Sequence, residues 1–139
     1  MSARPEQIDV VRQWVDKADN DLKNAVHTLT MGEDCPLDTV CFHAQQCVEK
    51  YLKAWLAFHA IDFPKSHDLT ELAALLPDNR VVPLSTDDYV SLTDYAIVTR
   101  YPGDWEIIHR TDAERAVTLA QQVRRAIRAM FPREVADGQ

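Results

Sequence analysis

Apolar residues recur at alternating steps of three and four in the first part of the chain, and this spacing is that of the apolar seam of an α-helix. The seam predicts a long first helix that ends near Gly32, with Pro5 in the first turn, where proline is tolerated. Its positions are Ile8, Val11, Val15, Ala18, Leu22, Ala25 and Leu29.

Two further helices are predicted in the middle of the chain. The second runs from about Asp38 to about Ala60, and its apolar face is so broad that we expect it to be central and packed by several neighbours. The third is short, has Ser66 as its N-cap, and is stopped by Pro77.

Capping boxes mark the last two helices. Ser85 with Asp88 predicts a fourth helix from about Thr86, which Pro102 and Gly103 prevent from continuing beyond Tyr101. Thr111 with Glu114 forms the same pattern ahead of a fifth helix that carries Ala113, Val117, Ala120, Val123, Ile127 and Met130.

The length and composition favour one all-α domain. The chain has 139 residues, is 46% hydrophobic, and holds only three glycines, which argues against a turn-rich β architecture. Short connections between amphipathic helices favour an antiparallel up-and-down bundle of four main helices plus one short helix. We expect the domain to span residues 1–132, with residues 133–139 as a frayed tail.

The net charge limits the classes of partner. A formal charge of -7 repels nucleic acid on average, so RNA contact is expected only at a local basic patch formed by Arg124, Arg125 and Arg128. The sequence has neither an apolar signal core at its start nor a run of apolar residues that could span a membrane. We therefore expect a cytoplasmic protein with no membrane contact.

No motif in the sequence predicts a metal or a cofactor. Cys35, Cys41 and Cys47 are odd in number and six residues apart, so neither a disulfide framework nor a zinc motif follows, and we interpret them as small apolar core groups. The sequence contains no HExxH pattern and no glycine-rich phosphate loop.

A polar stripe on the second helix has two interpretations. His43, Gln46, Lys50 and Lys53 fall within a quarter turn, opposite the main apolar face, and could converge on one anionic ligand. The alternative is a solvated helix surface, which the i,i+4 spacing of Glu49 and Lys53 favours because such a pair is an ordinary surface ion pair.

Candidate residues also occur at other helix ends. Arg100 and Tyr101, at the predicted end of the fourth helix, could clamp a phosphate and stack a base, although an arginine there is also favoured by the helix dipole. His109 precedes the fifth helix, and His67 opens the third, where a histidine can equally cap or pack.

Three segments in this order resemble the HEPN domain family. They are AQQCVEKYLKA, the SHDLTELAALLP segment, and RYPG before the last helix, and the resemblance covers about residues 8 to 131. It implies a helical bundle that commonly dimerises and is often found beside a minimal nucleotidyltransferase partner. It also implies nucleotide binding, and many family members are RNA-cutting toxins of toxin-antitoxin pairs.

Carried onto this sequence, the resemblance selects Arg100 and Tyr101 as the main ligand contacts, with Lys50, Lys53 and His67 beside them, and His43 and Gln46 on the same stripe. It implies a nucleotide-binding homodimer. Glu49 with Lys50 matches the Glu-Lys pair of the family, whose role is structural or functional.

Two alternatives to a nucleotide-binding module stay open. The first is a metal-independent endoribonuclease that uses Arg100 and His109. Nuclease members have four to six residues between the arginine and the histidine, whereas eight residues lie between Arg100 and His109. The second is a module that only binds another protein.

Overall fold

The protein is a bundle of α-helices. The computed structural model describes residues 4–96, 101–104 and 106–136, and these residues form no β-strand. The four main helices are α1 (Pro5–Leu29), α2 (Leu37–Phe58), α4 (Thr86–Asp94) and α5 (Arg110–Met130). The shorter elements are a 3-10 turn (Gly32–Asp34), α3 (Leu69–Ala74) and α6 (Arg133–Ala136). The predicted all-α helical bundle is thus confirmed.

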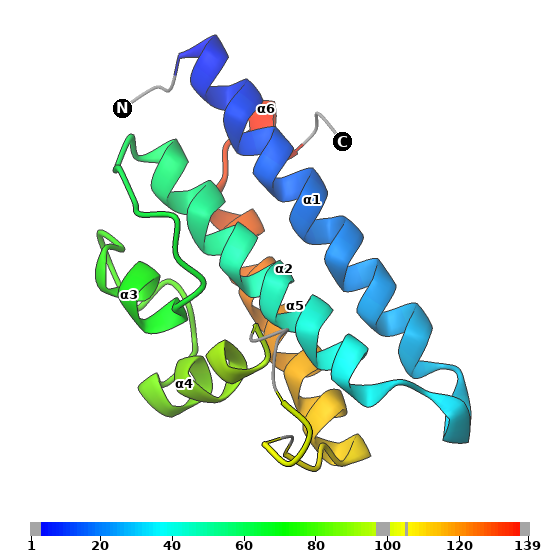
Figure 1. The fold of residues 1–139 in the computed structure, drawn as a ribbon. Helices are drawn as coiled ribbons and strands as arrows, with labels where there is room; N and C mark the ends of the chain where they lie inside the picture. Colours follow the sequence, from blue (N-terminus) through cyan, green and yellow to red (C-terminus); the bar gives the residue numbers. More distant parts are fainter. Residues whose placement is uncertain (1–3, 97–100, 105, 137–139) are drawn as a thin grey trace.

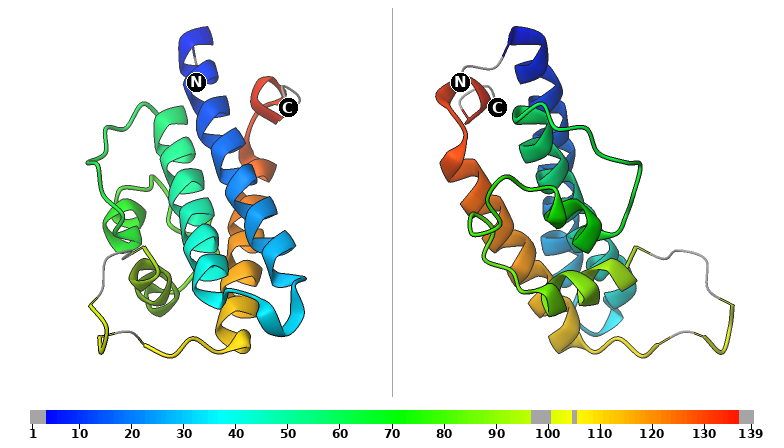
Figure 2. Two further views of the ribbon diagram at one scale, coloured as in Figure 1. Left: turned by 45° about the vertical axis from the view of Figure 1, so that its right-hand side comes forward. Right: turned by 90° about the vertical axis from the view of Figure 1, so that its left-hand side faces the viewer.

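The direction of each helix follows from the length of its connection. Residues 30–36 join α1 to α2, and this short link makes the two helices antiparallel (Figure 1). Helix α5 runs in the same direction as α2, because residues 59–109 return the chain to the end of the bundle where α2 begins (Figures 1 and 2). Helices α3 and α4 lie on this return path, beside α2.

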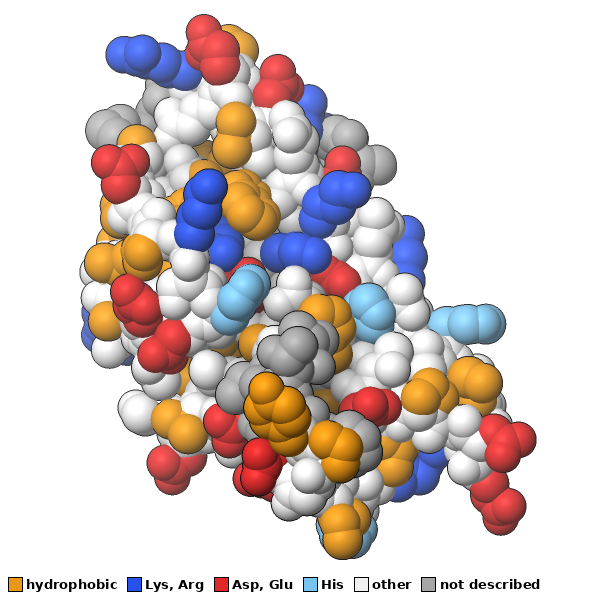
Figure 3. Space-filling model, in the orientation of Figure 1, with side chains coloured by type: hydrophobic (Ala, Val, Ile, Leu, Met, Phe, Trp, Pro, Cys, Tyr) orange, Lys and Arg blue, Asp and Glu red, His pale blue; other side chains and the backbone are white. Residues whose placement is uncertain are grey.

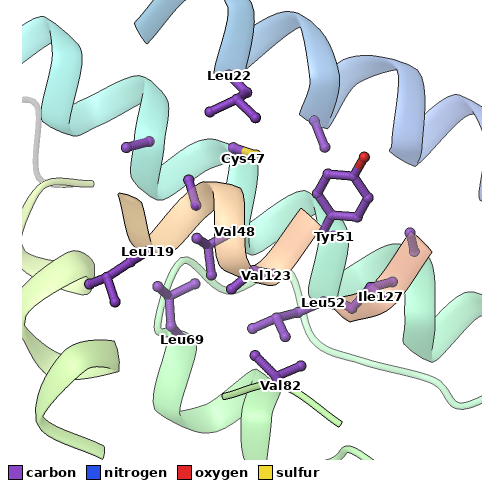
Figure 4. Packing of buried hydrophobic residues seen from close by; sticks show 14 of the residues in the cluster. Leu22, Cys47, Val48, Tyr51, Leu52, Leu69, Val82, Leu119, Val123 and Ile127 are labelled. Carbon is purple, nitrogen blue, oxygen red and sulfur yellow. The ribbon is translucent and has the colours of Figure 1, made fainter. Parts of the chain in front are cut away.

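Helix α2 is the centre of the core, as its broad apolar face predicts. Val48, Tyr51 and Leu52 are fully buried between the other elements (Figure 4). Opposite them lie side chains from α1, α3, α5 and the loop before α4, including Leu22, Leu69, Val82, Val123 and Ile127. Four elements bury apolar surface against α2, and this packing holds the helix in place. The side chains on its remaining polar side therefore project from a fixed backbone.

Two predicted helix starts are displaced by two residues. The N-cap of α3 is Asp68, whose carboxylate accepts the Thr70 N–H at 3.0 Å, and not Ser66, which accepts the Asp68 N–H instead. Helix α5 begins at Arg110, where Asp112 accepts the backbone N–H of His109 at 2.9 Å. In both helices an aspartate carboxylate accepts an N–H at the helix start, in place of the predicted serine or threonine hydroxyl. The Ser85–Asp88 box of α4 is confirmed.

The structure also corrects two predicted boundaries, which are the end of the fourth helix and the start of the frayed tail. Helix α4 ends at Asp94, so Tyr101 lies outside it. The tail expected from residue 133 is not frayed over residues 133–136, because these residues form α6 and bury Val135 completely. A single apolar residue in a polar segment is a weak signal in the sequence, and packing against α1 decides the outcome.

The cysteines are free thiols, as predicted. Cys41 and Cys47 are fully buried, and Cys35 is half-buried. Burial raises the pKa of Cys41 to about 12. A thiol with such a pKa stays protonated at neutral pH, so Cys41 behaves as a small apolar group and not as a nucleophile.

The end of α2 offers a simple test of backbone strain. Ala60 has φ of 55°, in the left-handed region, and the Ile61 N–H donates to Leu56 O at 2.9 Å in a Schellman turn. A side chain is disfavoured in this conformation and glycine is not. We expect Ala60→Gly to raise the free energy of unfolding by about 0.5–1 kcal/mol in urea titrations.

The matched control for this change is Ala129→Gly. Ala129 is exposed within α5, where the backbone is right-handed, so the same substitution should lower stability by about 0.5–1 kcal/mol. A loss of stability in both variants would show that residue 60 is not strained.

Candidate functional site

The polar stripe of α2 faces other parts of the protein and not only solvent. Gln45, Glu49 and Lys53 are 0%, 3% and 6% exposed. Of the four stripe residues, Lys53 is buried while His43, Gln46 and Lys50 are half-buried, so the interpretation as a solvated surface is wrong for Lys53. We call the following set the α2 polar band: Asp21, His43, Gln45, Gln46, Glu49, Lys50, Lys53 and His67.

Glu49 is the centre of the first half of the α2 polar band. Its carboxylate lies 3.0 Å from Lys53 Nζ and 2.8 Å from His67 Nδ1, and it accepts a hydrogen bond from Gln45 Nε2 at 3.2 Å. The Gln45 amide also donates to the backbone oxygen of His67 at 3.2 Å. The i,i+4 pair of Glu49 and Lys53 is thus confirmed, but as a buried pair and not as a surface pair.

Two aromatic rings cover the ammonium group of Lys53. Its Nζ lies 5.5 Å from the ring centre of Trp14 and 5.9 Å from that of Phe63. The two rings lie edge to face at 6.0 Å, and the side chains of Lys53 and Glu49 are only 8% and 4% exposed. Trp14, beside the seam of α1, was the one signal in the sequence that could have indicated a covered lysine.

Asp21 is the centre of the second half of the α2 polar band. Its two carboxylate oxygens are divided between His43 Nδ1, at 2.8 Å, and Lys50 Nζ. The His43 and Lys50 side chains are 23% and 22% exposed, while that of Asp21 is 11% exposed. Two cationic or potentially cationic groups therefore share one carboxylate, and both stay within reach of solvent.

The sequence did not single out Asp21. It lies one position before the seam residue Leu22, so its carboxylate is directed along the edge of the α1–α2 contact. A carboxylate beside an apolar seam was the available signal, because such a group must find a partner when it is buried. Figure 3 shows several basic side chains (Lys or Arg) and histidines on this face of the molecule.

The remaining predicted residues are not all brought together. Gln46 reaches the band through its bond to Gln45 at 2.7 Å, while His67 is exposed beyond Glu49. Tyr101 is 82% exposed, and His109 is exposed at the start of α5; within the described ranges, neither forms a hydrogen bond or ion pair with the α2 polar band. Arg100 lies outside the described residues.

The described residues show no site for a metal. No three His, Cys, Asp or Glu side chains among them are grouped so that they could hold an ion. None of the described helices combines the length and the apolar character that a bilayer crossing requires.

A comparison with models of protein families identifies the family of this chain. The model of the HEPN domain matches residues 11–130. The chain belongs to the HEPN domain family. This match covers all of the α2 polar band, all of α5 and most of α1, and it confirms the family that the sequence resembles.

Two solved structures are similar to this HEPN chain. The crystal structure of TT1696 from Thermus thermophilus has a TM-score of 0.69 and 28% sequence identity, over 87% of this chain and 98% of that one. The structure of ST0689, an archaeal HEPN homologue, has a TM-score of 0.60 and 22% identity, over 86% and 95%. A search of the curated proteins finds no match.

Proposed function

We propose that this HEPN protein is a binding module that holds the phosphate of a nucleotide, or of a nucleotide-bearing partner, at the α2 polar band. The observation that supports this most is the sharing of Asp21 by His43 and Lys50. The ammonium group of Lys50 has further N–H groups beyond the one that contacts Asp21, and the His43 and Lys50 side chains are both partly exposed. A phosphate at the open side of these groups would accept hydrogen bonds from them.

The other half of the band has a positioning role in this proposal. Lys53 is covered by Trp14 and Phe63, so a ligand reaches Lys50 and His43 more readily than Lys53. Glu49 holds Lys53 and His67 in fixed positions. Removing charges from water is costly, and apolar residues of similar size would fill the same space without that cost. These charges are therefore not needed for stability, which favours a functional role.

Arg100 and Tyr101 complete the proposed site. The family resemblance selects Arg100 for the phosphate and Tyr101 for stacking on a base, and the exposure of the Tyr101 ring leaves it accessible for that contact. We also propose that the module acts as a homodimer with a minimal nucleotidyltransferase partner. Ile107, which is 81% exposed, is an apolar group that a partner surface would cover.

A thermal-shift panel tests this proposal. A nucleotide that binds only the folded state at about 100 times its Kd stabilises it by about 2.7 kcal/mol, which raises the Tm by several degrees. We expect such a shift with at least one nucleoside mono-, di- or triphosphate, and its loss in Arg100→Ala and in Lys50→Met. Lys23→Met, on the opposite side of α1, is the matched control and should keep the shift.

Three outcomes would contradict the proposal. No nucleotide raises the Tm, or Lys50→Met keeps the full shift, or Lys23→Met loses it. RNA cleavage by the purified protein that is lost in His109→Ala, without any nucleotide-induced shift, would favour the endoribonuclease instead. The position of His109, exposed at the start of α5, leaves its imidazole accessible for that reaction.

A further inference from the structure

A second polar surface lies between α1 and α5. It is an open groove of about 520 Å³, and it shares no residue with the α2 polar band. Lys23, Arg124 and Arg125 line it together with the amide of Gln121, and its apolar part consists of Leu22 and Val26. Lys23 and Arg125 are exposed, and neither has an ion-pair partner among the described residues.

The one carboxylate of the groove is already occupied. Asp19 accepts a hydrogen bond from the buried hydroxyl of Tyr51, and it lies 3.0 Å from Arg124 Nε and 3.6 Å from Arg128 Nη1. Asp19 therefore fixes the Arg124 guanidinium and does not neutralise Lys23 or Arg125. The groove keeps a positive charge on a chain whose formal net charge is -7.

The apolar part of the groove limits which chemical class of ligand can bind there. Val26 is 40% exposed, and Leu22 beside it is 9% exposed, so the cations flank a small aliphatic surface that consists mainly of Val26. None of the described lining residues is aromatic, and the groove thus offers no ring for a nucleobase to stack on. Arg124 and Arg125 belong to the basic patch at which the sequence predicts RNA contact, so RNA is included in the test as the competing ligand.

From this combination we propose that the α1–α5 groove is a docking site for an acidic amphipathic helix of another protein. The apolar side chains of that helix lie on Leu22 and Val26, and its carboxylates contact Lys23 and Arg125. Helix-in-groove recognition uses this division between apolar anchors and flanking charges. Opposite charges also raise the rate at which the partner associates and exclude basic helices.

The test uses a fluorescent synthetic peptide with leucines at helical spacing and glutamates between them. We expect saturable binding in fluorescence anisotropy, and at least about a tenfold loss of affinity in the variant with both Lys23→Glu and Arg125→Glu. The matched control combines Lys17→Glu with Lys65→Glu, two exposed lysines outside the groove, and should bind as the unaltered protein does.

Two further probes test the aliphatic surface and the class of partner. A peptide with serine in place of every leucine has the same charge, and it should bind at least about tenfold more weakly. The proposal is overturned if the leucine peptide does not bind saturably, if the groove variant keeps its affinity, or if the control variant loses it. Tighter, groove-dependent binding of a single-stranded RNA of equal charge would overturn it in favour of RNA.

Discussion

Glu49→Ala is expected to lower the free energy of unfolding by about 3–5 kcal/mol, because it leaves a buried ammonium without its carboxylate. Lys53 is 6% exposed, and Trp14 and Phe63 prevent water from replacing the lost oxygen. The buried amide of Gln45 and the ring of His67 lose an acceptor at the same time. Urea unfolding monitored by circular dichroism measures this loss.

The chain contains a matched control for this pair. Glu114 forms an i,i+4 ion pair with Arg110 at 3.4 Å, but both side chains are exposed. Exposed helix pairs of this kind contribute about 0.3–0.5 kcal/mol, so Glu114→Ala should have a small effect. The comparison separates the effect of burial from that of the spacing, which is the same in both pairs.

A double variant separates the charge from the packing. Replacing Glu49 by Leu and Lys53 by Met together removes both charges while keeping similar volumes. We expect this variant to recover most of the stability that Glu49→Ala loses, since no uncompensated charge remains in the interior. A loss of less than about 1 kcal/mol in Glu49→Ala would show that the pair is hydrated, which contradicts its burial in the structure.

Asp19→Ala is expected to cost about 2–3 kcal/mol, because the hydroxyl of a fully buried tyrosine loses its acceptor. Tyr51 packs between α1 and α5, and burial together with the Asp19 carboxylate raises the pKa of its hydroxyl. Arg124 and Arg128 lose the same carboxylate. Helices α1 and α5 are thus joined through one acidic side chain that also reaches α2.

Removing the hydroxyl tests the cause of this loss. In the Asp19→Ala background, Tyr51→Phe should restore stability or leave it unchanged, because it removes the hydroxyl that has lost its acceptor. Asp9→Ala, at an exposed position of the same helix, is the control and should change stability by less than about 0.5 kcal/mol. Equal losses in the two aspartate variants would contradict the role that we assign to Asp19.

Most of the fold could be predicted from the sequence. The period of the apolar residues indicated α1, α2 and α5, because a helix that packs on one side must repeat apolar groups every three or four positions. The starts of α3 and α5 could not be predicted, since Ser66, Asp68, Thr111 and the other short polar residues near each start are all suitable caps. Which of them accepts the free N–H depends on where tertiary packing begins the helix.

Only part of the candidate functional site could be predicted from the sequence. Spacing along α2 placed His43, Lys50 and Lys53 on one stripe, since positions along a single helix follow from its geometry alone. Whether that stripe faces solvent depends on Asp21, Trp14 and Phe63, which come from other segments of the chain. The sequence by itself thus determined the helices and the residues that share a face. Only the tertiary structure decided which charges are buried, because burial and ion pairing depend on contacts between residues that are distant in the sequence.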